Sequence, residues 1–260
     1  MKIVKLFLAI LLTVFFIKCS DNSTNGNDPE ITDYSNQIAK LLPLEVGKTF
    51  SYNVDTLDNN SASYVEIGQR TFSVDKIDGD YIVCSEIYNY LQGLNLKTKF
   101  KMTENSIEII ADTNGTSNMI PDSLNLSVKL EMNETFKVIQ FPLEKNSTWE
   151  VFKAYAIMGT AKFNVFSLTA QYLGEESVAL NNSQQTQAHK FEYTLTINIP
   201  NLNNIMESKI QTYNANVWLA ENIGIIKMQG CGLFINSMTG NSFNMSDTNK
   251  TVKHTLVYSE

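Results

Sequence analysis

The sequence has very little of what nucleic-acid-binding proteins use to hold their ligands. Arginine occurs once in 260 residues, as Arg70. The formal net charge is −7, and without residues 1–18, which carry three lysines, 17 basic residues face 27 acidic ones, a net charge of −10. Arginine is the side chain that most often contacts phosphates and base edges through paired hydrogen bonds. The chain is therefore predicted not to bind nucleic acid, and an anionic membrane surface would repel it unless something else holds it there.

Signatures of catalysis and of metal binding are also missing from the sequence. It contains no G-x-S-x-G, H-E-x-x-H, Walker or G-x-G-x-x-G motif, each of which positions a nucleophile, a zinc ion or a phosphate. The three cysteines form no C-x-x-C pair and no Cys/His zinc constellation. We therefore predict no catalytic residue, no metal and no cofactor. A hydrolase that uses two carboxylates, such as a glycosidase, stays open as the alternative, because acids are plentiful and their geometry cannot be read from the sequence.

The N-terminus contains an apolar run that ends at a cysteine. Lys2 and Lys5 precede a mostly apolar stretch over residues 6–17. This stretch is too short to cross a bilayer as a helix and has the length of a signal-peptide core. Cys19 follows, and then the polar tract SDNSTNGNDP. This pattern resembles a bacterial lipoprotein signal, in which the cysteine carries the lipid. Lys18 departs from that pattern, because such signals normally have a small residue before the cysteine.

The resemblance implies that residues 1–18 are a cleaved signal peptide and that lipid is attached to Cys19. Residues 19–28 would then form a flexible tether, because the tract after the cysteine has no apolar side chain to bury. The protein would be exported and held to a bacterial envelope membrane by acyl chains, with the outer membrane as the expected one. A secreted protein with an unusual cleavage site and an uncleaved N-terminal anchor are the alternatives.

Cys84 and Cys231 are the cysteines that remain once Cys19 is taken as the lipid-attachment residue. An exported protein can pair two cysteines in a disulfide. Each of these two, however, lies in or beside an apolar segment, YIVCSEIY and KMQGCGLF. Because free cysteine is among the most buried residue types, we expect two buried thiols, with a disulfide as the alternative.

A short amphipathic helix is expected near residues 29–41. The Asp-Pro pair at its start has the chemistry of an N-cap and a first helical position. Four apolar or aromatic residues follow at helical spacing: Ile31, Tyr34, Ile38 and Leu41. Pro43 cannot continue a helix and is expected to end this one.

Beyond the helix, apolar residues recur at every second position. In residues 94–103 one face carries Leu94, Leu96, Thr98, Phe100 and Met102, and the other carries a lysine stripe, Lys97, Lys99 and Lys101. Segments 123–131, 188–199 and 211–219 alternate in the same way, with turn residues between them. This pattern is typical of half-buried antiparallel strands. We predict an all-β domain over residues 29–260: antiparallel sheets of about ten strands, packed as a sandwich or continued as one curved sheet, with a short N-terminal helix.

Two short sequence motifs, called phrases below, each occur twice along the chain, in the same order. LPLEVGKTF at 42–50 resembles FPLEKNSTW at 141–149, and FKMTENSIEII at 100–110 resembles VWLAENIGIIKM at 217–228. Proline cannot donate to a strand ladder, so each opening phrase fits a turn that leads the chain into a strand. The domain is therefore predicted to have two similar halves, 42–138 and 139–260. Either a unit was duplicated, or one solution for entering a strand is used twice.

These phrases also resemble a group of proteins. PLEVG, followed shortly by an aromatic residue, and WLAENIGIIK near the C-terminus are similar to exported lipoproteins of unknown function from diderm bacteria. The resemblance covers most of residues 42–230, and this chain has Phe50 where that group commonly has tryptophan. It implies a curved antiparallel sheet and an exported lipoprotein, and it implies no activity.

Three side chains on predicted strands are candidates for a site. His189 shares its face with Phe191, and His254 shares its face with Leu256. A histidine can act as a general base or a metal ligand, but we favour core or rim positions with one hydrogen bond satisfied. Trp218 stands on the polar face of its strand, where it either stacks on a sugar or a partner or covers a neighbouring helix or the second sheet. We favour the second interpretation.

Two clusters of charged residues could form binding sites. Asp75, Asp78 and Asp80 could be calcium ligands, but an Asp-Gly pair between two strands is typical of a tight hairpin, which we favour. The lysine stripe could form an anion-binding surface. We favour a solvated face whose charges discourage edge-to-edge aggregation.

The predicted function is that of a lipid-anchored envelope protein that serves as a non-enzymatic binding or structural module. The acyl chains on Cys19 would make its contact with the membrane. The sequence identifies neither a ligand nor a protein partner. A wide apolar cavity would favour a ligand carrier. Two carboxylates that face each other in a cleft, one with a raised pKa, would favour the hydrolase.

Overall fold

The computed structural model describes residues 32–58, 63–91, 95–110, 129–180, 184–200, 208–238 and 245–259. Most of these residues lie in strands, so the predicted all-β class is confirmed. The earlier elements are α2 (Ser35–Leu41), β1 (Thr49–Asp58), β2 (Val65–Asp78), β3 (Tyr81–Tyr88), β4 (Asn95–Met102), β5 (Ser106–Ile110), β6 (Lys129–Met132) and β7 (Thr135–Gln140). The later elements are β8 (Thr148–Met158), β9 (Ala161–Ala179), β10 (Gln185–Pro200), β11 (Ser208–Ala220), β12 (Gly224–Cys231), α3 (Gly232–Met238), the 3₁₀ helix η4 (Met245–Asn249) and β13 (Lys250–Ser259).

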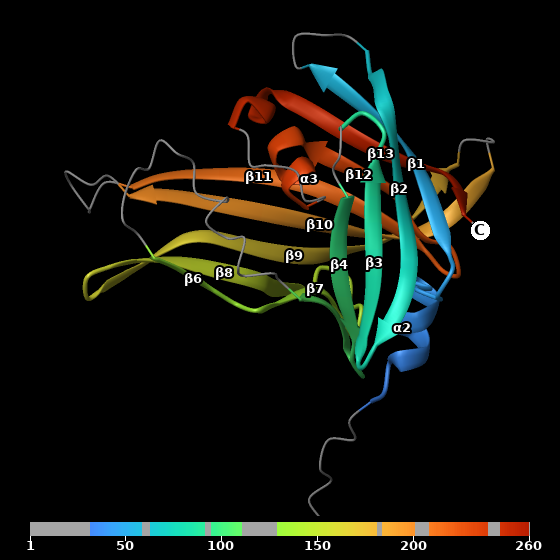
Figure 1. Ribbon diagram of the computed structural model, residues 1–260, viewed down its shortest axis with the longest axis horizontal. Coiled ribbons are helices and arrows are strands. Elements are labelled where there is room, and N and C mark those ends of the chain that lie inside the picture. The colour runs from blue at the N-terminus through green and yellow to red at the C-terminus, as the bar shows by residue number, and fades with distance from the viewer. Residues whose placement is uncertain are drawn as a thin grey trace, which may run out of the picture. The chain divides into compact units, whose positions relative to one another are not determined.

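The strands in the described ranges belong to one antiparallel sheet of thirteen. Its order is β6-β8-β9-β10-β11-β12-β13-β1-β2-β3-β4-β5-β7. β13, the last of these strands along the chain, lies between β12 and β1 and thereby joins the late strands to the early ones (Figure 1). Of the two predicted arrangements, one curved sheet is the one observed. The strands outnumber the predicted ten partly because β5 and β7 are too short to show a clear alternation.

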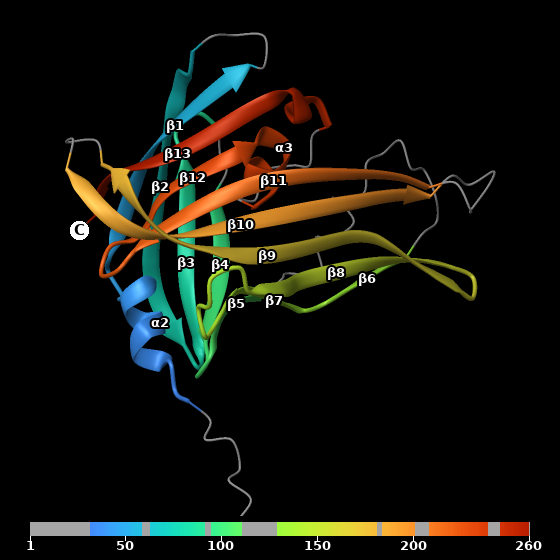
Figure 2. The ribbon, with the colours of Figure 1, turned by 180° about the vertical axis from the view of Figure 1, so that it is seen from behind.

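The sheet curves so strongly that its early and late strands cross. In Figure 1, β2–β4 stand nearly upright whereas β8–β11 run across the view, and Figure 2 shows the same crossing from behind. Hydrogen bonds join β7, which lies at the β1–β5 end of the sheet, to the late strands: the Trp149 indole donates to the Lys137 carbonyl at 3.0 Å, and the Tyr193 hydroxyl donates to the Val138 carbonyl at 2.8 Å. Several ladders contain register shifts, which bend strands and increase their twist.

One hydrophobic core is shared by both groups of strands. Phe100 on β4 belongs to it with 8% of its surface exposed. On the opposite face Lys97 and Lys99 are exposed, and Lys101 is half-buried. The predicted assignment of the two faces of β4 is therefore confirmed for the side chains that the structure describes.

The N-terminal helix is shorter than expected. α2 begins at Ser35 rather than near residue 29, and the described residues just before it are not helical. The Asp33 carboxylate accepts a hydrogen bond from the Ser35 backbone N–H at 2.8 Å, and such local bonds compete with helical pairing. Ile38 and Leu41 are buried, as their spacing predicted. Of the helices in the described part of the chain, none has the length and apolar character needed to cross a membrane.

The two opening phrases form the same turn, with two backbone hydrogen bonds inside the turn and two to a neighbouring strand. In the first turn these are Glu45 N to Pro43 O (3.1 Å), Lys48 N to Glu45 O (3.0 Å), Gly47 N to Val74 O (2.9 Å) and Val74 N to Lys48 O (2.9 Å). In the second they are Glu144 N to Pro142 O (3.1 Å), Ser147 N to Glu144 O (2.8 Å), Asn146 N to Tyr172 O (2.7 Å) and Tyr172 N to Ser147 O (3.0 Å). Gly47 and Asn146 hold the same position in the turn, with φ of 93° and 69°.

The strands that receive these turns carry matching bulges. On β2 the register with β3 skips Asp75, directly after Val74. On β9 the register with β10 skips Leu173, directly after Tyr172. The division of the domain into two similar halves stays a prediction. The matched turns and bulges are local features that the two predicted halves share.

Cys84 and Cys231 are both free thiols. Cys84 on β3 is fully buried, and burial raises the pKa of its thiol to about 12. Cys231 at the end of β12 is half-buried. The expectation of two thiols is confirmed, although Cys231 is less buried than expected.

Candidate functional site

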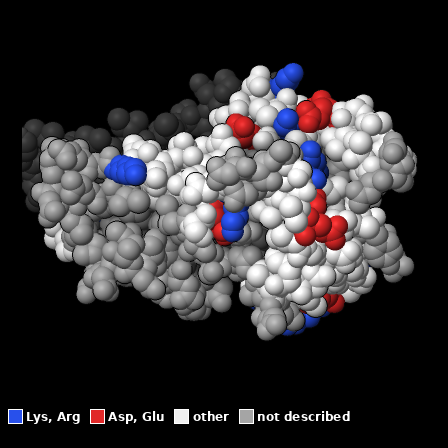
Figure 3. Space-filling view, turned by 90° about the horizontal axis from the view of Figure 1, so that it is seen from above, with Lys and Arg blue, Asp and Glu red and all other residues white. Residues whose placement is uncertain are grey.

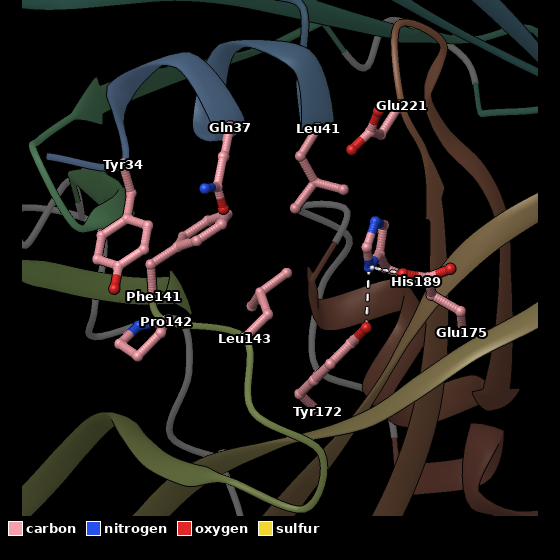
Figure 4. A pocket seen from close by; sticks show the side chains of 10 residues that line it. All are labelled: Tyr34, Gln37, Leu41, Phe141, Pro142, Leu143, Tyr172, Glu175, His189 and Glu221. Carbon is pink, nitrogen blue, oxygen red and sulfur yellow. Dashed lines mark hydrogen bonds and ion pairs between the residues drawn. The ribbon is translucent and has the colours of Figure 1, made fainter. Parts of the chain in front are cut away.

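A pocket opens beside α2, where the helix meets the turn between β7 and β8 and the strands β9 and β10 (Figure 4). Its volume is about 270 Å³. One wall is apolar and consists of Leu41, Phe141, Pro142 and Leu143. The remaining lining residues carry polar groups: Tyr34, Gln37, Tyr172, Glu175, His189 and Glu221. The pocket thus offers hydrogen-bonding groups on one side and apolar contact on the other.

Backbone hydrogen bonds hold α2 against both Glu-Asn turns of the sheet. Just before the helix, the Tyr34 N–H donates to the Glu104 carbonyl at 2.8 Å. At its end, the Lys40 carbonyl accepts from the Asn222 N–H at 2.7 Å. The helix therefore spans from the β4–β5 turn to the β11–β12 turn, and its position depends on both groups of strands.

The apolar wall is fixed in the same manner. The Phe141 N–H donates to the Asn105 carbonyl at 2.8 Å, which attaches the second opening phrase to the β4–β5 turn. The rings of Phe141 and Tyr34 lie 5.6 Å apart, tilted by 30°. Leu41 and Phe141 are buried, and Leu143 is half-buried. Burial of these side chains stabilises the position of the wall before any ligand is present.

Tyr172 and His189 form the centre of the polar wall. The Tyr172 hydroxyl and His189 Nδ1 are 2.9 Å apart, and a carboxylate oxygen of Glu175 lies 3.8 Å from the same nitrogen. Burial, and then the charge of Glu175, raises the pKa of Tyr172, so its hydroxyl stays protonated at neutral pH and can donate. The His189 side chain keeps 17% of its surface exposed. Figure 4 shows Glu221 on the other side of the imidazole from Tyr172.

The bulge in β9 brings the acidic side chain to the pocket. In a regular strand, residues three positions apart point to opposite faces, so Tyr172 and Glu175 would diverge. Leu173 is left out of the ladder, and Gly174 next to it has a φ of 102°. As a result Glu175 stands opposite His189 in the register, on the pocket side with Tyr172.

The two histidines have different surroundings. His189 lies at the rim of the pocket with one hydrogen bond, as predicted. His254 on β13 is fully buried in the core, also as predicted, but neither of its ring nitrogens has a hydrogen-bond partner among the described residues. Burial, and then the charge of Arg70, holds the pKa of His254 well below its usual range. The prediction that His254 makes one hydrogen bond is therefore wrong, because the side chains around His254 are apolar or already paired.

Trp218 is covered although it stands on the polar face of β11. Only 5% of its surface is exposed. Its indole N–H donates to the Glu176 carboxylate, and the ammonium groups of Lys190 and Lys227 lie 5.1 and 4.5 Å from its ring centre. Lysine side chains can cover an aromatic face with their stems while the charge contacts the ring. The ring is therefore packed, as we favoured, but by lysines of the flanking strands β10 and β12 rather than by a helix or a second sheet.

The aspartate group forms a hairpin, as predicted. Gly79 between β2 and β3 has a φ of 62°, which a tight turn requires. The Asp78 carboxylate lies 3.9 Å from the Lys76 ammonium and 4.0 Å from that of Lys99, and Asp75 accepts a hydrogen bond from Ser85. Figure 3 shows side chains of both signs interspersed on one face of the molecule. Within the described ranges, no group of three His, Cys, Asp or Glu residues could hold a metal ion.

The arrangement of carboxylates bears on the hydrolase alternative. Among the acids in the described residues, Glu86 is the buried one, and it accepts hydrogen bonds from Arg70 and Tyr88 at 2.9 Å each. Glu175 and Glu221 line the pocket, but both are exposed. A buried acid pair with one raised pKa, as a glycosidase uses, is not formed by the side chains that the structure describes.

Most of the pocket was not found from the sequence. His189 was singled out, whereas Tyr172, Glu175 and the inner face of α2 were not. Four lining residues nevertheless lie in the recurring phrases: Phe141, Pro142 and Leu143 open the second Pro-Leu-Glu phrase, and Glu221 belongs to the second Glu-Asn turn. The recurrence of these phrases was therefore the available clue, since the turns they form meet at α2. Cys19 lies outside the described residues.

Two solved structures are similar to this chain. One is a Bacteroides fragilis protein described as exported and as having a YmcC-like fold, with 12% identity, a TM-score of 0.45, and coverage of 85% of this chain and 98% of that one. The other is a Parabacteroides distasonis protein described as a lipoprotein, with 10% identity, a TM-score of 0.47 and the same coverage. No family model matches the chain, and no curated protein matches it.

Proposed function

We propose that this protein is an exported lipoprotein of a bacterial envelope, anchored by acyl chains on Cys19, and that its sheet serves as a non-enzymatic binding module with the pocket beside α2 as its ligand site. The single observation that carries the binding function is the composition of this pocket. Buried apolar side chains fix one wall, and a hydrogen-bonded tyrosine and histidine form the other.

Attachment through Cys19 is supported by physical arguments from the sequence. The apolar run that precedes Cys19 is too short to span a bilayer, and the acidic chain is repelled by anionic headgroups. One acyl chain holds a protein only marginally, whereas two or three hold it firmly at about 0.8 kcal/mol for each buried CH₂. We place the anchored chain at the outer membrane.

Metabolic labelling with an alkyne fatty-acid analogue tests the anchor. Cells that produce the protein should incorporate the label into it, and the Cys19→Ser variant should remain unlabelled. Cys84→Ser is the matched control, because it removes a buried thiol and leaves the lipidation site intact. An unlabelled wild type, or a Cys19→Ser variant that labels as well as wild type, would show that lipid is not attached at Cys19. Separation of inner and outer membranes then locates the labelled protein.

The pocket has features of a ligand site rather than of a packing defect. Ligand pockets combine apolar surface with placed polar groups that fix the orientation of the ligand. Here the half-buried Leu143 supplies partly exposed apolar surface, and Tyr172 and His189 supply oriented hydrogen-bonding atoms. At about 270 Å³ the pocket is slightly smaller than the roughly 300–1,000 Å³ of typical ligand pockets, so it suits a very small molecule or a single group of a larger one.

Native mass spectrometry of the full chain, purified from membranes in detergent, tests binding at this pocket. Leu143→Trp would fill the cavity, and Leu180→Trp is the control at another half-buried leucine that packs against the core outside the pocket. Wild type and Leu180→Trp should carry a non-covalent species of the same mass, which Leu143→Trp should lack. A wild-type chain without any bound species, or a Leu143→Trp chain that keeps it, would refute the pocket as the ligand site while leaving the anchor untouched.

A further inference from the structure

The strand that joins the late part of the sheet to the early part carries a buried histidine. His254 lies on β13, opposite Val54 of β1 on one side and opposite Met228 of β12 on the other. None of its surface is exposed, and both ring nitrogens lack a hydrogen-bond partner in the described part of the chain. Buried polar atoms are normally paired, because desolvation without a hydrogen bond costs free energy. An unpaired imidazole at this junction costs free energy, so we expect a function that would account for it.

The charges around His254 are already balanced without it. The Arg70 guanidinium on β2 donates from Nε to Glu86 of β3 at 2.9 Å, and its Nη1 lies 3.6 Å from the sulfur of Met228. Arg70 also lies over the rings of Tyr52 and Phe72, at 5.2 and 5.8 Å from their centres. Arg70 and Glu86 neutralise each other, so a proton on His254 would add a second positive charge to a buried site.

The other elements packed against β13 offer no compensating acid at this point. Tyr88 on β3 already donates to Glu86. α3 contains no acidic or basic residue. On η4, Asp247 pairs with Lys250 at 3.2 Å, and on β1, Asp55 pairs with Lys253 of β13 at 2.9 Å. A protonated His254 would thus meet a cation and no free carboxylate among the described residues.

We propose that His254 is a proton-sensitive latch of the sheet, which keeps β13 in place while its imidazole is neutral and releases β13 from β12 and β1 when the imidazole is protonated. β13 is suited to this motion because its pairing with β12 is shorter than its pairing with β1. Its ladder with β12 is short and runs only from Lys227–Thr255 to Cys231–Thr251. The β12–β13 boundary is therefore the first to open.

The direction of the pH effect follows from proton linkage. An exposed histidine takes up a proton near pH 6.5, whereas burial, and then Arg70, holds the pKa of His254 well below that value in the closed sheet. The opened state therefore binds more protons than the closed state between these two pKa values. The latch is fully closed above about pH 6.5 and loosens as the pH falls, with the ratio of open to closed chains rising roughly tenfold for each pH unit.

Amide hydrogen exchange on the full chain in detergent tests the latch. The His189→Gln background is used, because the chain has two histidines and this change leaves His254 as the sole imidazole. Protection factors, corrected for the intrinsic exchange rate at each pH, are measured at pH 7.5, 6.5 and 5.5. Amides of β12, β13 and β1 should lose protection by up to about tenfold per unit below pH 6.5. Amides of β3 and β9 should lose markedly less.

The controls separate a local latch from general acid unfolding. Adding His254→Gln should remove the pH dependence at β12, β13 and β1. Equal loss of protection on all strands, or the same pH dependence with His254→Gln, would overturn the proposal. Should His254→Gln fail to fold, the ring carbon shifts of His254 in the His189→Gln chain decide the matter. A folded-state pKa at or above 6.5 would refute the latch, and one well below it would support the latch.

Discussion

Arg70, the one arginine of the chain, lies in the core and not on a binding surface. Its side chain is 6% exposed, and that of its partner Glu86 is 7% exposed. Two charges removed from water are costly to bury, and their hydrogen bonds and mutual attraction offset that cost only while both are present. The aromatic rings beneath Arg70 and the Tyr88 hydroxyl on Glu86 complete the contacts of the pair. The pair is thus a structural unit of β2 and β3.

This pairing predicts a non-additive pattern of stability in urea denaturation. Arg70→Met and Glu86→Leu should each lower the free energy of unfolding by about 3–5 kcal/mol, because each leaves one buried charge without its partner. The double variant should lose clearly less than the sum of the two single losses, since it removes both charges. Additive losses would mean that the two side chains do not act as a pair.

The two faces of β4 should differ in their sensitivity to substitution. Phe100→Ala should lower the free energy of unfolding by about 3–5 kcal/mol, because the ring is buried and packs edge-on against Phe72 at 6.0 Å. Replacing the lysine stripe by glutamine should change it by less than about 1 kcal/mol, since exposed charges contribute little. Chemical denaturation measures both, and similar losses from the two changes would contradict the assignment of the faces.

At the scale of elements, the repeated Pro-Leu-Glu turn shows how short phrases specify local geometry. Both copies place a residue with positive φ at the same point, and both are closed by the same pattern of backbone hydrogen bonds. Glycine adopts this conformation readily, and asparagine is the next most tolerant common residue. The turn delivers the chain into β1 in one copy and into β8 in the other. In the second copy it also forms a wall of the pocket.

Substitutions at these two equivalent positions should act in opposite directions. Gly47→Ala should lower the free energy of unfolding by about 1–2 kcal/mol, because a side chain is strained at a φ of 93°. No atom lies within 4 Å of the added Cβ, so the cost arises from the backbone alone. Asn146→Gly should raise the free energy of unfolding by up to about 1 kcal/mol by relieving the same strain. Val46→Ala, an exposed change in the first turn, is the control and should stay within about 0.5 kcal/mol.

At the scale of the whole molecule, one sheet and one core connect the early and late strands. Phe136 on β7 stacks on Phe152 of β8 at 4.4 Å between ring centres, although the two strands are not neighbours in the sheet. α2 contacts turns from both groups of strands. These contacts cross the boundary between the two predicted halves, so neither half has a complete core of its own.

Unfolding at neutral pH should therefore be a single cooperative transition. Both tryptophans, Trp149 and Trp218, lie in the late strands, so their fluorescence reports on that part of the sheet, whereas far-ultraviolet circular dichroism reports on all strands. The two signals should have the same midpoint in urea. A circular-dichroism transition at a different urea concentration from the fluorescence transition would mean that the halves unfold independently.

Local periodicity in the sequence was sufficient to determine the class of the fold. Side chains alternate along a strand with a period of two, so the pattern around Phe100 and around Phe191 already separates the buried face from the exposed one. The turn at Gly79 and the two Pro-Leu-Glu turns follow from residues that are adjacent in sequence. Such features depend on neighbours only a few positions apart, which is why they can be read without a structure.

The order of the strands and the pocket were decided by tertiary structure alone. Nothing in the periodicity places β13 between β12 and β1, because any strand edge can pair with any other and the choice depends on the packing of the whole core. The pocket joins Leu41, Phe141, Tyr172 and Glu221, which come from four separate segments. A bulge on β9 turns Glu175 toward His189, and a bulge is a property of two paired strands. Contacts between distant segments are set by the packing of the complete chain, and no local pattern encodes them.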